Sequence, residues 1–557
     1  MTILNLSTLE NPQSTVQAPI CVIGAGIAGL FFARKVAREG HKVIVLESGY
    51  ESFDAAIHGL NEIEDASQRY SRALTGRYRG LGGTSSRWGG RVIPISRHEA
   101  AERSYISQTA WPFDLGKLDK YNGEIESLLK LDDSFYDGNV FDDGEAPDRF
   151  PSDDPYLKLR WAKCPSFKRC NIATVIRKEL KSPNIEIWLG ATVCGFGVDR
   201  EHGRLNSVTA RDIDGNTLEV RADEFVVAAG TIETTRLLLL LDAATDNQAF
   251  RRCDALGRYF QDHLKSTVAT ISRRNALLSN SLFAYRFLNS TRRDLHLELS
   301  EAAQREDRVS SAFAYVSMDL EGSPLAQLKK VAQSVQRRQF DLDSAWRMSR
   351  NMKLLAQAAR WRLLRGQLFV PADIDFNLLV CVEQLPNRAN RIRLAEARDR
   401  FGMPKALFEW SPRQEDERTF RSAISHIGAY WRRAGFEESC PLDWTKAAAD
   451  PALPIIEGAE ACAHPSGSTR MGSDPAHSVV GQDLRCHAVP NVAVASASVF
   501  PTAGSANPTF TIMKLALWLA DSWLQKARCT APVYTSASPL ELGDELAAMS
   551  SAPVGQT

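Results

Sequence analysis

The sequence predicts an α/β protein in which a nucleotide-binding domain is interleaved with a second domain. Three observations predict this architecture. A strand, glycine turn, helix and strand follow one another over residues 19–47, similar patterns return near the C-terminus, and residues 265–455 have a different character, with alternating strand-like runs and helices. At 557 residues the chain is also too long for one simple core, so two domains are the default expectation.

The overall composition excludes several classes of protein. Hydrophobic residues make up 44% of the chain and charged residues 24%, which is ordinary for a globular protein rather than a disordered or fibrous one. Lys+Arg and Asp+Glu both number 67, so no global field favours nucleic acid as a partner. Any electrostatic function must therefore be local.

Cysteine usage and the N-terminal sequence bear on metal binding and location. The ten cysteines form no CxxC pair and no Cys/His ligand spacing, so we predict no metal site. Isolated cysteines with apolar neighbours are typical of buried thiols in a reducing compartment. Residues 1–18 are polar, lack a secretory signal pattern and are expected to be flexible. Since no apolar run approaches the roughly 20 residues of a membrane span, we expect a cytoplasmic protein.

The first strand–helix–strand unit carries the fingerprint Gly24-Ala-Gly-Ile-Ala-Gly29. Its three glycines permit a tight turn, close approach of the backbone to a pyrophosphate and close packing of helix on strand. A helix predicted over 27–39 directs its N-terminal N–H groups at the phosphates. Glu47 ends the next strand, where a carboxylate can accept ribose hydroxyls. The carboxylate argues against NADP but does not separate NAD from FAD.

A second glycine-rich segment occupies residues 80–90, where five of eleven residues are glycine. Such a loop cannot pack a core, but it can bring many backbone amides against a flat polar ligand. The alternative is a flexible surface turn. Further strands are predicted at 185–193, 205–210 and 224–232, followed by a helix over 233–241, so the nucleotide domain resumes after an insertion and extends to 264.

The candidate substrate domain spans residues 265–455, with strands predicted at 376–383 and 391–394. Within it, residues 329–365 carry ten basic side chains against two acidic ones, interleaved with Trp, Met and Leu. A basic amphipathic segment can lie on a membrane surface or receive an acidic partner. The alternative is a pair of solvated helices around the entrance of an enzyme.

Two short blocks near the C-terminus offer polar groups for chemistry. The first, residues 463–472, places His464 in a Gly/Ser/Pro turn, and the second, residues 504–512, places Asn507 just before a Pro-Thr step that opens a helix predicted over 509–524. A strand is predicted at 491–499. Residues 456–527 are therefore expected to return to the nucleotide domain. The tail over 528–557 is rich in Ser, Ala, Pro and Thr and is expected to be disordered.

Taken together, these segments resemble the glucose–methanol–choline (GMC) oxidoreductase family, in its bacterial and pyranose-oxidase-like branch. The likeness covers the fingerprint, residues 80–90, 190–193, 228–236, 256–264, 383–388, 464–472 and 490–512. It implies a Rossmann-like FAD-binding domain over 19–264 and 456–527, and a substrate domain with a large antiparallel sheet over the isoalloxazine.

The resemblance also implies roles for individual residues. His464 corresponds to the active-site histidine of the family and Asn507 to its Asn/His partner. Some members attach FAD covalently through a histidine near the glycine loop, where this chain has Ser86, Arg87 and Trp88, so we expect non-covalent FAD. The residues expected to bind FAD are Gly24, Gly26, Ile27, Ala28, Gly29, Glu47, Gly82, Gly83, Thr84, Ser85, Trp88, Val193, Ala229, Gly230, Ser498, Asn507, Pro508 and Thr509.

The chemistry expected of these residues is alcohol oxidation. A neutral imidazole at His464 can accept the hydroxyl proton, and the amide of Asn507 can hold the same oxygen. The helix that follows aims its N-terminal dipole at the flavin, where it stabilises negative charge. His263 and His487 lack comparable context and are interpreted as structural, and His477 has no support as a base.

The leading hypothesis is therefore an FAD-dependent oxidoreductase acting on a sugar, polyol, aminocyclitol or glycoside hydroxyl, with oxygen or an external acceptor receiving the electrons. One alternative is an apolar or lipid alcohol as substrate, with residues 329–365 on a membrane. Another is a non-redox lyase in which FAD is structural. A pure nucleotide-binding module fits poorly, because His464 and Asn507 would then have no purpose.

Overall fold

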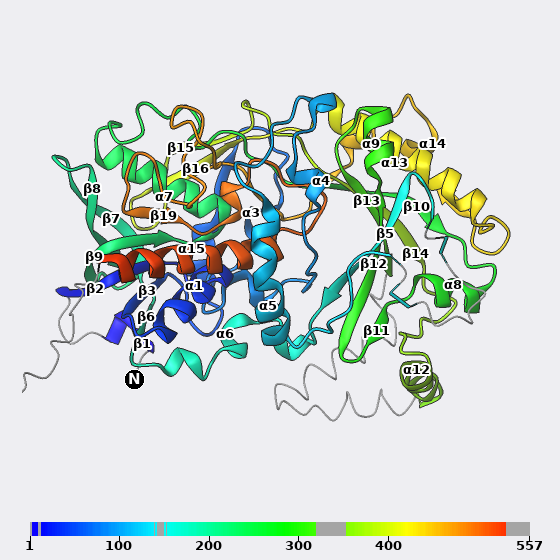
Figure 1. Cartoon of the computed structure of the whole chain (residues 1–557), viewed down its shortest axis with the longest axis horizontal. Helices are drawn as coiled ribbons and strands as arrows, with labels where there is room; N and C mark the ends of the chain where they lie inside the picture. Colours follow the sequence, from blue (N-terminus) through cyan, green and yellow to red (C-terminus); the bar gives the residue numbers. More distant parts are fainter. Residues whose placement is uncertain are drawn as a thin grey trace, which may run out of the picture.

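The computed structural model describes residues 3–8, 13–138, 140–141, 150–151, 153–318 and 352–530. Two large sheets lie side by side in the molecule, a mostly parallel one and an antiparallel one (Figure 1). Each sheet has its own cluster of buried apolar side chains. The chain passes between the two units several times, as the resemblance implies for an interleaved α/β protein.

The parallel sheet is built on the predicted strand–helix–strand unit. Strand β2 lies at its centre, because Cys21 pairs with Ile44 of β3 on one side and with Phe225 of β9 on the other. The order is β1 (Ile3–Asn5), β6 (Ile185–Leu189), β3 (Val43–Glu47), β2 (Gln13–Ile23), β9 (Thr217–Val227), β8 (Arg204–Arg211) and β7 (Thr192–Asp199), with β19 (Val492–Val494) also against β9. Only β7 and β8 run antiparallel to their neighbours, so the carboxyl ends of the other strands meet at one edge.

The prediction that residues 1–18 are flexible is wrong for the residues of this segment that the structure describes. Residues 13–18 form the first half of β2 and pair in register with β9, and residues 3–5 pair with β6. These residues are polar or only partly buried, so their hydropathy gave no strand signal. Their order comes from backbone hydrogen bonds to neighbouring strands, which composition does not reveal. Residues 1–2 and 9–12 lie outside the described residues.

Helices cover the parallel sheet. The helix α1 (Ile27–Arg38) follows the glycine turn, and α15 (Thr509–Thr530) packs along it, as the red helix of Figure 1 shows. The helix α7 (Gly230–Ala244) packs against β7, β15 and β16. Since α15 continues to Thr530, the disordered tail expected from 528 does not begin there, and residues 531–557 lie outside the described part.

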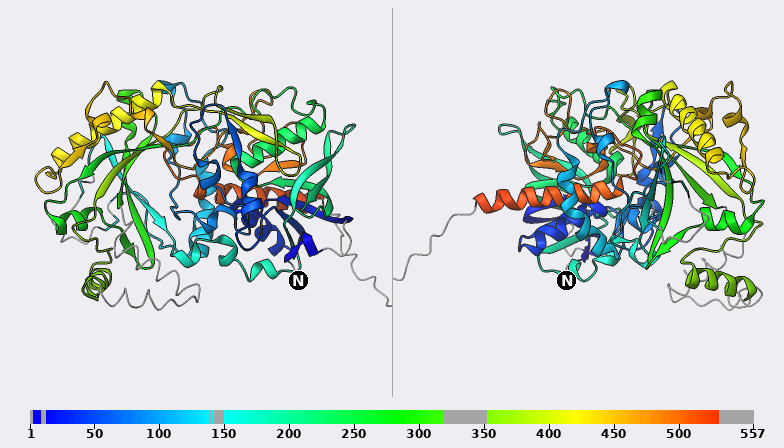
Figure 2. Two further views of the ribbon diagram at one scale, coloured as in Figure 1. Left: turned by 180° about the vertical axis from the view of Figure 1, so that it is seen from behind. Right: turned by 45° about the vertical axis from the view of Figure 1, so that its right-hand side comes forward.

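The antiparallel sheet carries the second unit. Its order is β11 (Arg286–Leu288), β12 (Thr291–Leu299), β13 (Ala312–Met318), β14 (Phe376–Val382), β10 (Leu264–Ile271) and β17 (Leu442–Trp444), with β5 (Leu157–Cys164) against β12 and β18 (Glu460–Ala461) against β10. The helix α13 (Gln414–Arg433) covers this sheet on its outer side (Figure 2). A small third sheet joins β15 (Arg391–Arg398), β16 (Pro404–Glu409) and β4 (Ile63–Asp65).

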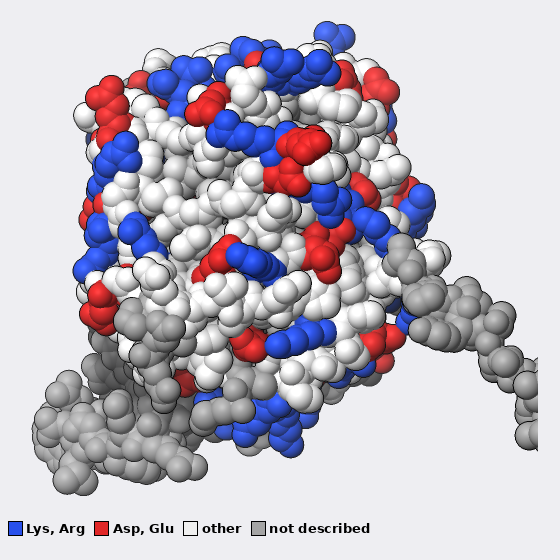
Figure 3. Space-filling model, turned by 90° about the vertical axis from the view of Figure 1, so that its left-hand side faces the viewer, with Lys and Arg blue, Asp and Glu red and all other residues white. Residues whose placement is uncertain are grey.

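The surface gives little direct evidence of a partner. Lys and Arg are interspersed with Asp and Glu on the face in Figure 3. Across the described ranges, no helix combines the length and apolarity needed to cross a membrane, and no group of three or more His, Cys, Asp or Glu side chains could hold a metal ion. Of the basic segment 329–365, residues 329–351 fall outside the description, and α12 (Met352–Leu364) occupies most of the remainder.

Candidate active site

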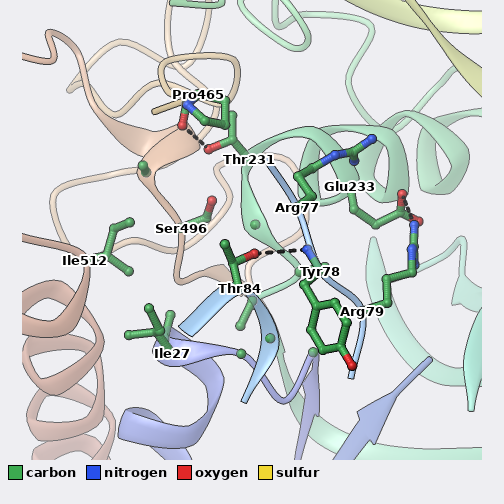
Figure 4. A pocket seen from close by; sticks show the side chains of 18 of the residues that line it. Ile27, Arg77, Tyr78, Arg79, Thr84, Thr231, Glu233, Pro465, Ser496 and Ile512 are labelled. Carbon is green, nitrogen blue, oxygen red and sulfur yellow. Dashed lines mark hydrogen bonds and ion pairs between the residues drawn. The ribbon is translucent and has the colours of Figure 1, made fainter. Parts of the chain in front are cut away.

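A cavity of ≈ 470 Å³ lies where both glycine-rich segments meet both C-terminal blocks. Its volume is in the usual range for small-molecule and cofactor sites. Figure 4 shows side chains from distant parts of the sequence around this space, among them Ile27, Thr84, Ser496 and Ile512. The cavity thus unites segments separated by more than 400 residues, as the sequence analysis expected.

The glycines of the fingerprint have different roles in this wall. A Cβ on Gly29 would lie 2.0 Å from Gly24 O, so Gly29 permits the packing of α1 on the turn. A Cβ on Gly24, which has φ +109°, would lie 2.7 Å from Ala228 O. The nearest atom to a Cβ on Gly26 is 4.0 Å away, and Gly26 lines the cavity. Of these three glycines, only Gly26 leaves space for a ligand, whereas Gly24 and Gly29 avoid clashes with the protein itself.

Glu47 lies at the end of β3 and lines the cavity. Its carboxylate accepts the N–H groups of Ala25 and Gly49, each at 2.9 Å. Burial raises the pKa of Glu47, although these backbone N–H groups and Arg79 oppose the shift. The carboxylate thus braces the glycine turn as well as facing the ligand space.

The glycine-rich loop over 80–90 packs directly on the fingerprint. Gly82 N donates to Ala25 O at 2.9 Å, and a Cβ on Gly83, which has φ +55°, would lie 2.9 Å from Gly26 Cα. Gly83, Thr84 and Trp88 line the cavity. The loop is therefore an ordered wall of the site rather than a free surface turn.

The predicted FAD-binding residues divide into two groups. Most line the cavity, and four lie behind its wall. The lining group contains Gly24, Gly26, Ile27, Ala28, Glu47, Gly83, Thr84, Trp88, Val193, Ala229, Gly230, Asn507, Pro508 and Thr509. The supporting group contains Gly29, Gly82, Ser85 and Ser498. Ser85, for example, is buried and donates to Gly82 O at 2.5 Å, so it holds the loop in shape.

Three charged residues of the wall had no sequence signal. Arg79 forms an ion pair with Glu233 at 2.8 Å, and Arg77 lies beside it (Figure 4). Burial and the neighbouring Arg79 lower the pKa of Arg77 to about 10. Burial opposes ionisation of Glu233, but Arg79 and Arg236 prevail and hold its pKa at about 2. The role of these three residues depends on contacts across the fold, so the sequence alone did not indicate it.

His464 lies at the opposite side of the cavity and is held by three partners. Its Nδ1 is 2.8 Å from Nδ1 of His263, its Nε2 is 3.1 Å from Nδ2 of Asn507, and its backbone N–H donates to Asp262 Oδ1 at 2.9 Å. The preceding residue, Ala463, has φ +61°, a left-handed conformation that is costly for a residue with a side chain. The backbone is thus constrained where it presents the imidazole.

The hydrogen bonds fix the tautomer of both rings. His263 Nε2 is 2.6 Å from Gly504 O, and a carbonyl oxygen only accepts, so Nε2 of His263 carries a proton. Burial lowers the pKa of His263, which keeps the ring neutral and leaves a lone pair on its Nδ1. His464 Nδ1 must then donate to it. The lone pair of His464 therefore sits on Nε2, the nitrogen that faces Asn507.

The pKa of His464 is lowered well below 6.5, first by burial and then by His263 and Arg91. The imidazole is consequently neutral near pH 7, with its lone pair on Nε2. Asn507 Nδ2 donates to that lone pair, and Asn507 Oδ1 is buried with no hydrogen-bond partner within the described structure. A buried acceptor without a donor is costly, so this oxygen is suited to a ligand O–H or N–H.

A buried ion pair anchors the turn that holds His263. Glu383 Oε1 accepts Gly504 N–H at 2.9 Å and pairs with Arg103 Nη2 at 2.7 Å. The side chains of Arg103 and Glu383 are both 0% exposed. Glu99 also accepts Ser505 N–H at 2.5 Å. The turn therefore has two carboxylates beneath it, which fix the carbonyl that orients the imidazole pair.

The other histidines stand apart from the cavity. His487 Nε2 contacts Gly472 O at 3.2 Å and Ser478 Oγ at 3.1 Å within a loop, and the His477 side chain is 74% exposed. Both agree with the sequence interpretation. His263 does not, because it contacts the predicted active-site histidine directly. Because His263 lies 201 residues before His464 in the sequence, no motif spacing indicated that the two side chains meet.

The end of the cavity nearest the antiparallel sheet is polar. Arg91 lines it and pairs with buried Asp294 at 2.8 Å. The Arg91 guanidinium also lies 5.1 Å from the ring centre of Tyr315. Arg91 can therefore donate hydrogen bonds to a ligand at this end of the cavity.

Comparisons with known proteins identify two matching families and several relatives. Residues 386–516 match the GMC oxidoreductase family, and residues 19–248 match the FAD dependent oxidoreductase family. The chain is 23% identical to 2-methyl-1,2-propanediol dehydrogenase of Mycolicibacterium austroafricanum across 91% of this chain and 95% of that enzyme. It is 34% identical to paromamine 6'-oxidase of Streptomyces fradiae over 133 residues, which are 24% of this chain and only 22% of that oxidase.

Solved structures share the fold. A mutant of formate oxidase from Aspergillus oryzae RIB40 superposes with a TM-score of 0.55 at 14% identity, covering 92% of this chain and 99% of that one. Pyridoxine 4-oxidase from Mesorbium loti gives a TM-score of 0.54 at 15% identity, covering 91% and 99%. At such identities the likeness concerns the architecture alone.

Proposed function

The chain belongs to the GMC oxidoreductase family of FAD-dependent enzymes, and from that premise we propose that it oxidises a hydroxyl group of a sugar or polyol, with His464 as the base. The observation that carries the proposal is the unprotonated Nε2 of His464, which faces Asn507 at the cavity. A neutral imidazole in this position can accept the hydroxyl proton of an alcohol, a contribution of about 10²–10⁴ in rate.

The residues present fit FAD. The two glycine segments leave space beside Gly26, the N-terminus of α1 would face the pyrophosphate, and Arg77 would add positive charge to the same cavity. The unpaired Oδ1 of Asn507 requires a donor from a ligand. When bound, FAD supplies the acceptor for the hydride that leaves the carbinol carbon.

We expect FAD to be held without a covalent bond. The single histidine in the described cavity lining is His464, which is engaged by His263 and Asn507. The glycine loop offers Ser86, Arg87 and Trp88 where covalent attachment would need a histidine. Denaturation followed by filtration should therefore release the flavin into the filtrate.

The roles of the side chains follow from their hydrogen bonds. A substrate hydroxyl would displace Asn507 Nδ2 from the lone pair of His464 Nε2, donate its proton to Nε2 and accept from Asn507 Nδ2. His263 accepts the Nδ1–H of His464 and so keeps Nε2 unprotonated. The N-terminus of α15, next to Asn507, places its positive dipole end at the cavity and favours negative charge there.

A polar substrate is favoured by the wall beyond His464. Arg91 lines the cavity there and is held by an ion pair with buried Asp294, so a polyol would find a hydrogen-bond donor. The names of two relatives, a propanediol dehydrogenase and a paromamine oxidase, also concern polar hydroxyl compounds.

An anaerobic screen of alcohols tests the proposal. The FAD-loaded protein is mixed with sugars, polyols and simple alcohols without oxygen, and bleaching of the flavin absorbance is followed. We expect bleaching with a polyhydroxy compound, and admission of oxygen then distinguishes an oxidase from a dehydrogenase that uses an external acceptor. If no alcohol bleaches the flavin, the redox proposal fails and a lyase with structural FAD becomes the better description.

A second candidate is an apolar alcohol taken from a membrane surface. The helix α12 exposes Leu363 by 83% and Leu364 by 74% beside Arg362 and Arg365. Exposed leucines flanked by arginine suit an interface with anionic lipid. Sedimentation with anionic vesicles tests it, because only this candidate predicts binding that weakens with salt.

A further inference from the structure

A second cavity, of ≈ 610 Å³, lies apart from the cofactor site and is lined by charges of predominantly one sign. Its four arginines face a single glutamate, Glu415, although the whole chain has equal numbers of acidic and basic residues. The arginines are Arg308, Arg413, Arg418 and Arg470. Such a local excess of positive charge in a concave site attracts anions.

The arginines converge from three separate elements. Arg308 directly follows α9 (Glu301–Asp307), Arg413 and Arg418 lie at the start of α13, and Arg470 lies within the block 463–472 that carries His464. Figure 1 shows α9 and α13 next to each other. Because the chain brings these guanidinium groups together from distant positions, the cluster is a property of the fold rather than of a basic run in the sequence.

Two of the four arginines lack an anionic partner. Arg413 and Arg418 share Glu415, at 3.3 and 3.9 Å. Neither Arg308 nor Arg470 has an ion-pair partner among the residues that the structure describes. The guanidinium carbon of Arg470 lies 4.5 Å from the ring centre of Tyr259. This contact orients the guanidinium group but leaves its positive charge unneutralised.

Arg308 also occupies a conformation that glycine would take more easily. It has φ +52° at the C-terminus of α9, the left-handed position where helices favour Gly or Asn. An arginine there costs conformational energy, and its side chain forms part of the cavity wall.

The remaining wall supplies hydroxyl groups of the kind that accompany arginine at oxyanion sites. Tyr105, Ser107, Thr109 and Thr502 line the same space. A volume of this size suits a small molecule, whereas a macromolecular partner would meet a flatter and larger surface. We propose that this cavity binds a small anion that carries phosphate or carboxylate groups.

The anion site is distinct from the proposed alcohol site and does not depend on it. None of its lining residues belongs to the first cavity. It nevertheless lies behind the active-site wall, since Tyr259 precedes His263 by four residues and Arg470 follows His464 by six. A bound anion would thus contact segments that hold the imidazole pair.

Isothermal titration of the FAD-loaded protein tests the proposal. Pyrophosphate and citrate serve as separate probes for the two oxyanion types, while the flavin spectrum confirms that the probe does not displace FAD. We expect at least one probe to bind with a Kd of about 1 mM or tighter, and more weakly as salt rises. The tighter probe identifies the preferred group.

Two variants give the matched comparison. Arg308→Gln combined with Arg418→Gln changes two exposed side chains of the cavity, and binding should weaken by about tenfold or more. Arg432→Gln lies on the same helix, α13, near its other end, about 20 Å away along the axis, and should bind as the parent protein does. The proposal is overturned if neither probe binds the parent protein, or if the double variant binds as tightly as Arg432→Gln.

Discussion

The Nδ1 atoms of His263 and His464 lie 2.8 Å apart, so a single proton lies between them in a hydrogen bond. Because the carbonyl of Gly504 accepts from Nε2 of His263, the ring of His464 is the donor in that bond. The orientation of the base thus depends on a backbone oxygen that never meets the substrate. This relation makes His263 a positioning residue in the proposed reaction.

Replacing His464 by Ala should leave FAD bound but slow flavin reduction by an alcohol by about 10²–10⁴-fold, because the proton acceptor is lost. Anaerobic stopped-flow spectroscopy measures this directly. His477→Ala changes an exposed histidine and serves as the control. Reduction at the parental rate in His464→Ala would remove the imidazole from the mechanism.

Replacing His263 by Phe should slow flavin reduction by about 10- to 100-fold, the value of one lost hydrogen bond at the base. His263→Asn retains an oxygen that can accept from His464 Nδ1 and should recover part of the rate. A purely structural role predicts equal losses in both variants, with melting temperatures lowered in parallel.

The pH dependence of reduction should reflect the low pKa of His464. Since the base acts unprotonated and its pKa lies well below 6.5, the rate should hold below pH 6.5 and fall only at more acidic pH. Burial is the main cause of the shift and His263 the next, so His263→Asn should move the acidic limb upward. An acidic limb at or above pH 6.5 in the parent protein would contradict the assignment.

Gly26→Ala should fold normally but bind FAD at least about tenfold more weakly, since its Cβ meets no protein atom closer than 4.0 Å and projects beside the cavity. Gly29→Ala should instead disrupt the turn, because its Cβ would lie 2.0 Å from Gly24 O. Gly123→Ala, at an exposed position of helix α5 (Asn122–Leu129), is the control for the substitution itself. Fluorescence titration of apoprotein with FAD gives the affinities.

Glu383→Gln should destabilise the fold by about 3–5 kcal/mol, because Arg103 would keep a buried charge without its partner. Glu301→Gln breaks an exposed pair with Arg305 and should cost about 1 kcal/mol or less. Chemical denaturation compares the two. Equal stabilities would mean that the buried pair contributes no more than a surface one.

The strand–helix–strand unit could be predicted within a few residues, because its strands are continuous apolar runs and its glycines have a defined spacing. The strands β5 and β12 could not. They bury Arg160, Lys163, Arg293 and Glu298, whose charges are paired within the fold, so the alternation typical of a strand is absent from their hydropathy.

The candidate site divides in the same way. His464 and Asn507 could be identified because their two blocks resemble those of the GMC family, and the two side chains are 3.1 Å apart in the structure. His263, Arg77 and Arg79 could not, because their significance arises only from contacts across the fold. A residue that acts through another leaves no local pattern.

The position of β19 has a consequence for how the protein is made. Val492–Val494 pair with β9, and β18 pairs with β10, so the last hundred residues complete both sheets. A ribosome delivers the N-terminal segments first, and domains generally fold as they emerge. Neither sheet of this chain can close before these downstream strands have been synthesised. The nascent protein must therefore keep both sheets incomplete until then, and His464 meets His263 only after about 200 further residues have been added.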